Sequence, residues 1–160
     1  MITIPFKDWT LKVDREATIA AYAAVTNGSA NGCECADCKN YSACRDNIFP
    51  ISVKSLLAQL GIDCNKESEV WKVNRDDNGL HLYNGIFHYK GSFEGKDCAI
   101  PMEGGNGFTF SMTPIDNLMS IGFWMSNSLS YFENKEDVVQ VEFEVKLPWV
   151  IDKALEYETS

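Results

Sequence analysis

The stretch VVQVEFEVKL, residues 138–147, alternates between two kinds of side chain along its length. In a β-strand, Val139, Val141 and Phe143 would point to one face, and Gln140 and Glu142 would point to the other. Such alternation is typical of an antiparallel strand that has one face on a core and the other in water. The sequence therefore predicts an antiparallel sheet with one solvated face.

Shorter segments with the same two-residue period precede this stretch from residue 69 onward, separated by clusters of Asn, Asp, Gly and Pro. They read VWKV, LHLY, IFHY, FTFSM and IGFWM, and residues 2–13 alternate in a similar way. Two helices are expected earlier in the chain, at 15–26 after the N-cap residue Asp14 and at 50–60 before Gly61. The prediction is an α+β fold in a single domain (1–160), mainly an antiparallel sheet of six or more strands with two helices in the N-terminal half.

The segment LHLYNGIFHYKG, residues 80–91, contains the dipeptide Asn84-Gly85 between alternating apolar residues. This is a strong signal for a two-residue type I′ turn, because both turn positions need positive φ. Such a hairpin would place His81 opposite His88 with their Cβ atoms about 5 Å apart. The two histidines could then share a metal ion or form an ordinary cross-strand pair.

Four of the six cysteines lie in NGCECADCKNYSAC, residues 31–44, with the spacing C-x-C-x2-C-x5-C. Thiolates brought together by tight bends can surround one tetrahedral zinc ion. In a mixed site, one or both histidines would replace some of the thiolates and tie this segment to the sheet. The candidate ligands are Cys33, Cys35, Cys38, Cys44, His81 and His88.

Two other interpretations of the cysteine segment stay open. The thiols can be small, reduced side chains in a turn without a ligand, or Cys35 and Cys38 can form a redox-active C-x-x-C pair at the start of a short helix. A thioredoxin-like pair would follow a β-strand, whereas this one follows a predicted helix and a Gly/Asn-rich loop. Four cysteines are also enough for an iron–sulfur cluster. Cys64 and Cys98 stand alone and are expected to be buried as small hydrophobic residues.

Fourteen basic and twenty-three acidic residues give a formal charge of -9. A nucleic-acid backbone would be repelled by most of such a surface, whereas a basic protein would be attracted, so an inhibitor or immunity-type role is one alternative. The sequence shows neither a signal peptide nor a membrane-spanning segment, which predicts a cytoplasmic protein. Thiols stay reduced in that compartment, which favours metal binding over disulfides.

No catalytic motif is found in the chain. G-x-S-x-G, H-E-x-x-H and the P-loop are absent from the sequence, and no spacing of carboxylates singles out a general acid and base. No catalytic residue is therefore assigned. The function predicted from the sequence is a binding or interaction module, with a protein as its partner and a structural zinc ion at the cysteine cluster.

Four segments together resemble a family of small uncharacterised bacterial proteins: CECADCKNY, LGIDCNKESEVW, LHLYNGIFHYKG and VQVEFEVKLPWV. Members share a C-x-C-x-x-C-x-N-aromatic segment, an aromatic hairpin and a C-terminal Pro-Trp motif, and the likeness spans most of residues 33–151. The resemblance implies a bacterial intracellular protein and brings no activity, ligand or catalytic residue. Cys44 lies outside the shared segment, which favours a histidine of the hairpin as the fourth ligand.

Overall fold

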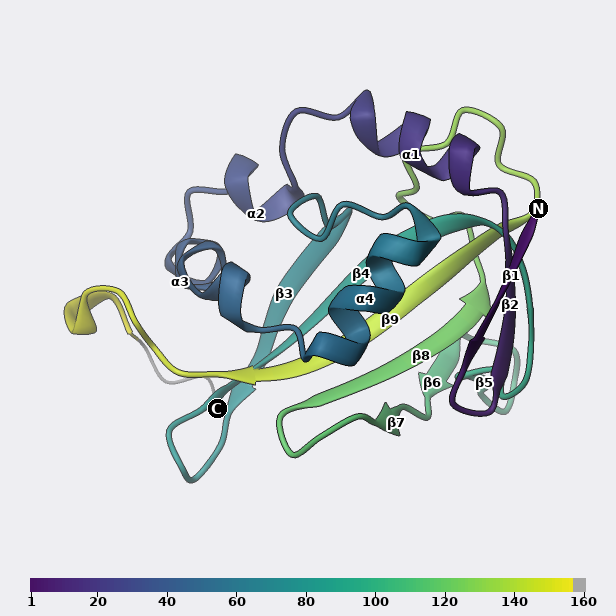
Figure 1. Ribbon diagram of the computed structural model, residues 1–160. Coiled ribbons are helices and arrows are strands. Elements are labelled where there is room, and N and C mark those ends of the chain that lie inside the picture. Colours follow the sequence, from purple (N-terminus) through teal and green to yellow (C-terminus); the bar gives the residue numbers. More distant parts are fainter. Residues whose placement is uncertain (157–160) are drawn as a thin grey trace.

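An antiparallel sheet of seven strands organises residues 1–156, the part of the chain that the computed structural model describes (Figure 1). The strands are β1 (Ile2–Phe6), β2 (Trp9–Val13), β3 (Glu69–Arg75), β4 (His81–Glu94), β7 (Thr113–Pro114), β8 (Met119–Met125) and β9 (Val138–Leu147), and a separate two-stranded ribbon is formed by β5 (Ala99–Pro101) and β6 (Phe108–Phe110). The helices are α1 (Arg15–Ala23), α2 (Ser29–Gly32), α3 (Ala36–Cys44) and α4 (Ile51–Leu60), with 3-10 turns η1 (Arg45–Asn47) and η2 (Lys153–Leu155). The predicted α+β class and antiparallel sheet are confirmed.

Strands β4 and β9 form the centre of the sheet. Their ladder runs from the pair His81–Leu147 to the pair Lys90–Val138, and β8 lies on the other side of β9. The long strand β4 has two further neighbours on its opposite edge, because β3 pairs with its first half and β2 with its last residues. The strand predicted most clearly from its alternation is therefore the middle one of the sheet.

The helices cover one face of this sheet and enclose the core (Figure 1). Phe143 of β9 packs against the rings of Tyr41 and Phe49, which come from α3 and from the segment before α4. Four buried residues of α4 complete this layer: Val53, Leu56, Leu57 and Leu60. The apolar face of β9 is buried as the sequence predicts.

Both helices expected from the sequence are present. Asp14 caps α1 by accepting a hydrogen bond from the N–H of Ala17 at 3.0 Å, and Gly61 ends α4 with a left-handed φ of 83°. Helix α1 ends three residues before the predicted boundary. The longest helix, α4, has ten residues, and no helix among residues 1–156 is long and apolar enough to cross a membrane.

The turn predicted at Asn84-Gly85 is wrong, because β4 continues straight through this dipeptide. Asn84 pairs with Trp71 of β3 on one side and with Glu144 of β9 on the other, so both neighbouring strands continue past this dipeptide, although the β3–β4 register shifts between Lys72 and Asn74. Gly85 is required for a different reason: a Cβ atom built there would lie 2.1 Å from the ring of Phe143. The glycine makes room for a core ring and does not provide a positive φ.

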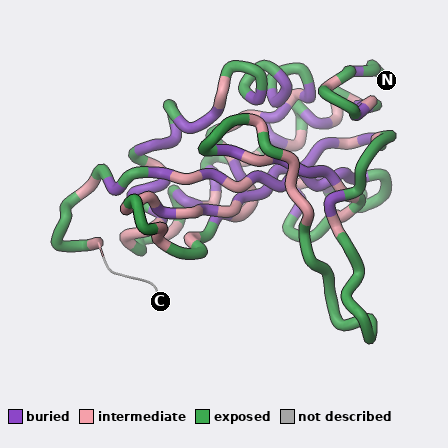
Figure 2. The backbone as a smooth tube through the Cα atoms, turned by 90° about the horizontal axis from the view of Figure 1, so that it is seen from below, coloured by how far each residue is buried: buried purple, intermediate pink, exposed green. Residues whose placement is uncertain are grey.

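The second face of the sheet is less open to water than its polar residues predict. Gln140 and Glu142 are only 4% and 8% exposed. The β5–β6 ribbon projects on this side, away from α4, and its residues from 100 to 110 are all exposed (Figure 2). Phe110 of the ribbon packs on Trp124 of β8, and together they help to cover the polar side chains of β9.

Candidate metal centre

Three of the predicted ligands come together at the junction of α2 and α3. The Sγ atoms of Cys33, Cys35 and Cys38 all lie within 4.8 Å of one another, and those of Cys33 and Cys35 are 3.2 Å apart. Among residues 1–156, no other group of three or more His, Cys, Asp or Glu side chains has this geometry. We call these three residues the cysteine triad, and its sulfur atoms are close enough to hold a metal ion.

The backbone around the triad explains why the sulfur atoms converge. Helix α2 ends at Gly32, Cys33 and Cys35 adopt extended conformations, and α3 then begins at Ala36. Cys35 is the N-cap of α3, where its Sγ accepts a hydrogen bond from the N–H of Cys38 at 3.4 Å. The partial positive charge at the N-terminus of α3 is therefore directed at this sulfur atom.

Local contacts move the pKa values of two thiols in opposite directions. Hydrogen bonds from the backbone and side chain of Cys35 lower the pKa of Cys33. Burial is the main cause that raises the pKa of Cys38, since its thiolate would lie away from water. A bound cation would stabilise the buried Cys38 thiolate, because metal ions bind cysteine in its deprotonated form.

The triad opens onto a cavity of about 540 Å³ on the edge of the sheet. Glu69, Trp71 and Lys72 of β3 line the opposite wall, and Lys72 forms an ion pair with Asp37 at 3.3 Å. Neither carboxylate lies within 4.8 Å of all three sulfur atoms. A tetrahedral ion on the triad would therefore keep one position open toward this cavity in the part of the chain that is described.

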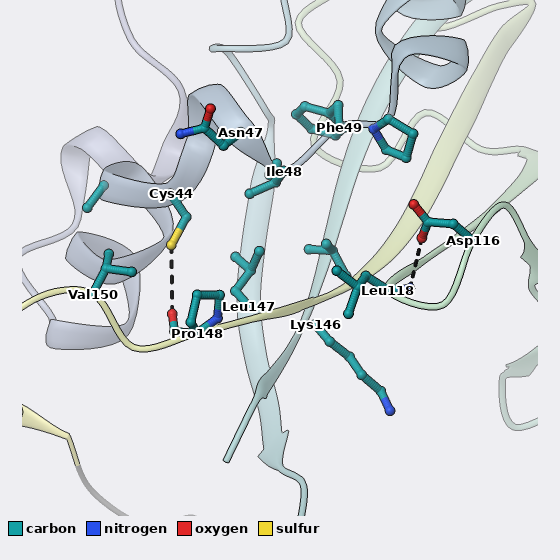
Figure 3. A pocket seen from close by; sticks show the side chains of 13 residues that line it. Cys44, Asn47, Ile48, Phe49, Asp116, Leu118, Lys146, Leu147, Pro148 and Val150 are labelled. Atoms are coloured by element: carbon teal, nitrogen blue, oxygen red, sulfur yellow. Dashed lines mark hydrogen bonds between the residues drawn. The ribbon is translucent and has the colours of Figure 1, made fainter. Parts of the chain in front are cut away.

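Cys44 does not belong to the triad. It lies six residues after Cys38 on α3, which is about 120° around the helix axis. Figure 3 shows its Sγ directed at the carbonyl oxygen of Pro148, at 3.7 Å, in the wall of a second cavity of about 440 Å³. Of the two isolated cysteines, Cys98 is buried as expected and Cys64 is half-buried.

The two histidines are not brought to the triad or to each other. They are seven residues apart on β4, on opposite faces and about 23 Å apart along the strand. His81 Nε2 lies 2.7 Å from Glu156 Oε1, whereas His88 Nε2 lies 3.2 Å from Gln140 Oε1. Burial lowers the pKa of His88 to about 4, so this ring is neutral at pH 7. Because β4 does not turn at Asn84-Gly85, the predicted pair of His81 and His88 is not formed.

Asn40, to which the sequence pattern assigns no role, fixes α3 to the chain that follows β9. It is fully buried, its Nδ2 donates to the carbonyl oxygen of Pro148 at 3.0 Å, and its Oδ1 accepts from the N–H of Val150 at 2.8 Å. The asparagine of the C-x-C-x-x-C-x-N segment therefore holds the backbone on both sides of Trp149. In the sequence, the signal for this role is the position of Asn40 two residues after Cys38.

A buried ion pair connects segments that lie before and after the triad in the chain. Arg45 Nη2 lies 2.7 Å from Glu67 Oε1, and the same oxygen accepts from the N–H of Ala30 at 2.9 Å. Arg45 Nη1 donates to Asn31 Oδ1 at 2.6 Å. The pair therefore joins η1, which follows α3, to α2, which precedes the triad.

Comparisons with protein-family models, with curated proteins and with solved structures find no match for this chain. What the protein binds is therefore inferred from its own side chains. The cysteine triad is the group among the described residues whose chemistry points to a ligand most directly.

Proposed function

We propose that this protein binds one zinc ion through the thiolates of the cysteine triad, Cys33, Cys35 and Cys38. The observation that carries the proposal is the approach of all three Sγ atoms to within 4.8 Å of one another. With zinc–sulfur bonds of about 2.3 Å, two ligands of a tetrahedral ion lie about 3.8 Å apart, which requires only small shifts of the side chains. Thiolate ligands select zinc over hard cations such as Mg²⁺ or Ca²⁺.

The ion would act first as a local staple. Its three ligands span six residues, so it would fix the connection between α2 and α3 where these helices contact β3. The fourth position would take water or a donor group of a partner that enters the cavity beside Glu69 and Lys72. This supports a binding module whose zinc ion lies at the contact surface.

Metal analysis of freshly purified protein tests the proposal. We expect one zinc per chain that persists through dialysis, and loss of most of this zinc in Cys38→Ser. The matched control is Cys44→Ser, which changes a buried cysteine of the same helix and should keep a full equivalent. Cobalt added to the metal-free protein should give thiolate-to-metal charge-transfer absorption. Wild-type protein that neither retains zinc nor binds cobalt would contradict the proposal.

A second candidate function is thiol redox chemistry, and the position of Cys35 Sγ at the N-terminus of α3 is the observation that favours it. Oxidised glutathione would accept two electrons and two protons from the Cys35 and Cys38 thiols, so that a Cys35–Cys38 disulfide forms, the glutathione disulfide breaks and two glutathione thiols are produced. Metal-free protein with a fast-reacting Cys35 and a reversible disulfide to Cys38 would support this candidate over zinc binding. Slow reaction of every thiol would exclude it.

A further inference from the structure

A larger cavity of about 610 Å³ lies on the face of the sheet that carries the polar side chains of β9. Its floor is formed by β3, β4, β8 and β9, and part of its wall comes from β6. Three carboxylates line it, those of Glu69, Glu142 and Glu144, and no Lys, Arg or His side chain does. None of these three carboxylates forms an ion pair within residues 1–156.

Glu142 is largely buried, and the two oxygens of its carboxylate lie in different surroundings. Its Oε1 accepts hydrogen bonds from Trp124 Nε1 at 3.0 Å and from Gln140 Nε2 at 2.5 Å. Its Oε2 accepts no hydrogen bond from residues 1–156 and is not one of their completely buried oxygens, so it is accessible from the cavity. Burial is the main cause that raises the pKa of Glu142, and the hydrogen bonds from Trp124 and Gln140 act in the opposite direction.

A second acceptor in the same cavity also lacks a donor. Asn84 lines the cavity from β4, and its side-chain Oδ1 is buried without a hydrogen-bond partner among residues 1–156. Buried acceptors are nearly always paired in folded proteins. A buried unpaired acceptor on Asn84 and an accessible carboxylate oxygen on Glu142, both on one cavity, indicate a ligand that brings several donors.

Aromatic rings supply the rest of the wall. Trp124 packs against Phe108 and Phe110 of the ribbon with ring centroids 5.2 and 5.4 Å away. Trp71, which is 42% exposed, lines the cavity from β3. Indole faces attract cations, and the rings also offer apolar surface to a hydrocarbon chain.

We infer that this cavity binds a small primary amine in its ammonium form, with Glu142 as the counter-ion and an aryl or alkyl chain against the tryptophans. The ammonium group carries three donors, which match the free oxygens of Glu142 and Asn84. A cavity of this volume is within the range that holds a small organic ligand. A lysine side chain of another protein presents the same chemistry, and the two sources are separated by experiment.

The test compares ligands of equal shape and different charge on the wild-type protein. Calorimetry and tryptophan fluorescence, to which Trp71 and Trp124 of the cavity contribute, would follow binding of phenethylammonium, of its neutral analogue 2-phenylethanol and of the anion 3-phenylpropionate. We expect phenethylammonium to bind about tenfold more tightly than the alcohol, and the anion not to bind. Tighter binding of Nα-acetyl-lysine methylamide than of phenethylammonium would assign the ammonium to a protein partner, and the reverse would assign it to a small molecule.

Two variants locate the site. Glu142→Gln should weaken phenethylammonium binding about tenfold, whereas Glu103→Gln, the same change at an exposed position of the ribbon, should leave it unchanged. Cys38→Ser should also leave it unchanged, which separates this cavity from the zinc site. The inference is wrong if the alcohol binds as tightly as phenethylammonium or if neither ammonium ligand binds. Should Glu142→Gln fail to fold, the charge comparison on the wild-type protein decides alone.

Discussion

Replacing Arg45 by Met should lower the free energy of unfolding by about 3–5 kcal/mol, the usual cost of breaking a buried ion pair. The side chains of Arg45 and Glu67 are only 8% and 0% exposed, and their closest N–O distance is 2.7 Å. The change removes the guanidinium and leaves the Glu67 carboxylate buried. Among the described residues, the backbone N–H of Ala30 then remains as its hydrogen-bond donor. It also removes the donor to Asn31 that holds α2.

The direction of the Glu67 pKa shift shows that burial disfavours the charge of this carboxylate. Burial raises this pKa even though the Arg45 guanidinium acts in the opposite sense, so the carboxylate depends on every compensating contact it has. Each hydrogen bond to a charged group is worth about 1.5–3 kcal/mol, and two such bonds of the guanidinium disappear in Arg45→Met. In the double variant Arg45→Met with Glu67→Leu no buried charge remains, and the expected cost falls to about 1–2 kcal/mol for the N–H of Ala30.

Urea unfolding of metal-free protein, followed by tryptophan fluorescence, measures these differences through the midpoint and the slope of the transition. The matched control is Lys12→Met, which breaks the ion pair with Glu94, where the side chains are 49% and 72% exposed. This control should cost less than about 1 kcal/mol. A loss below about 1 kcal/mol in Arg45→Met, or a double variant no more stable than the single one, would refute the reasoning.

Three further predictions follow from other buried contacts. Because burial lowers the pKa of His88 to about 4, the unfolded chain takes up this proton first. The stability that neutral His88 contributes is complete above pH 6.5 and is lost as the pH falls toward 4, by about 3 kcal/mol. In urea titrations, the free energy of unfolding of the wild type should therefore fall more between pH 7.5 and pH 4.5 than that of His88→Gln. An equal difference between the two proteins at both pH values would show that His88 does not titrate in this way. Asn40→Ala removes hydrogen bonds of 3.0 and 2.8 Å to the chain beyond β9 and should cost about 2 kcal/mol in calorimetry, with the exposed Asn106→Ala as a neutral control. Gly91→Ala should cost at least about 2 kcal/mol, because its φ is 150° and its Cβ would lie 1.9 Å from the carbonyl oxygen of Lys12; a midpoint of urea unfolding equal to wild type would contradict this.

The parts of the fold that could be predicted are those in which side-chain periodicity and burial agree. The apolar face of β9 and the stripe of α4 both pack on the core, and Asp14 and Gly61 mark helix ends where their chemistry requires. The turn predicted at Asn84-Gly85 is wrong because a glycine that makes space for a ring cannot be distinguished in the sequence from a glycine that turns the chain. Only the neighbouring strands reveal which of the two it is.

The candidate site was predictable to the extent that it is local. The triad lies within six residues, and its spacing indicates a metal site before any tertiary contact is known. The position of Cys44 is predicted wrongly because the short helix considered at Cys35 and Cys38 continues to Cys44 and turns this thiol away, and the segment ADCKNYSAC has no clear apolar stripe that would indicate such a length. The unpaired oxygens of Glu142 and Asn84 depend on four strands that meet only in the fold, so no local pattern could indicate them.

The central position of β9 has a consequence for synthesis of the protein on the ribosome. The strands on both sides of it, β4 and β8, are translated first. The edge with which each of them pairs with β9 stays unpaired until residues 138–147 emerge. The nascent chain therefore holds two halves of a sheet that cannot join, and such open edges favour aggregation unless a chaperone covers them. The triad cysteines, by contrast, emerge about a hundred residues earlier and can capture a metal ion while most of the sheet is still to be made.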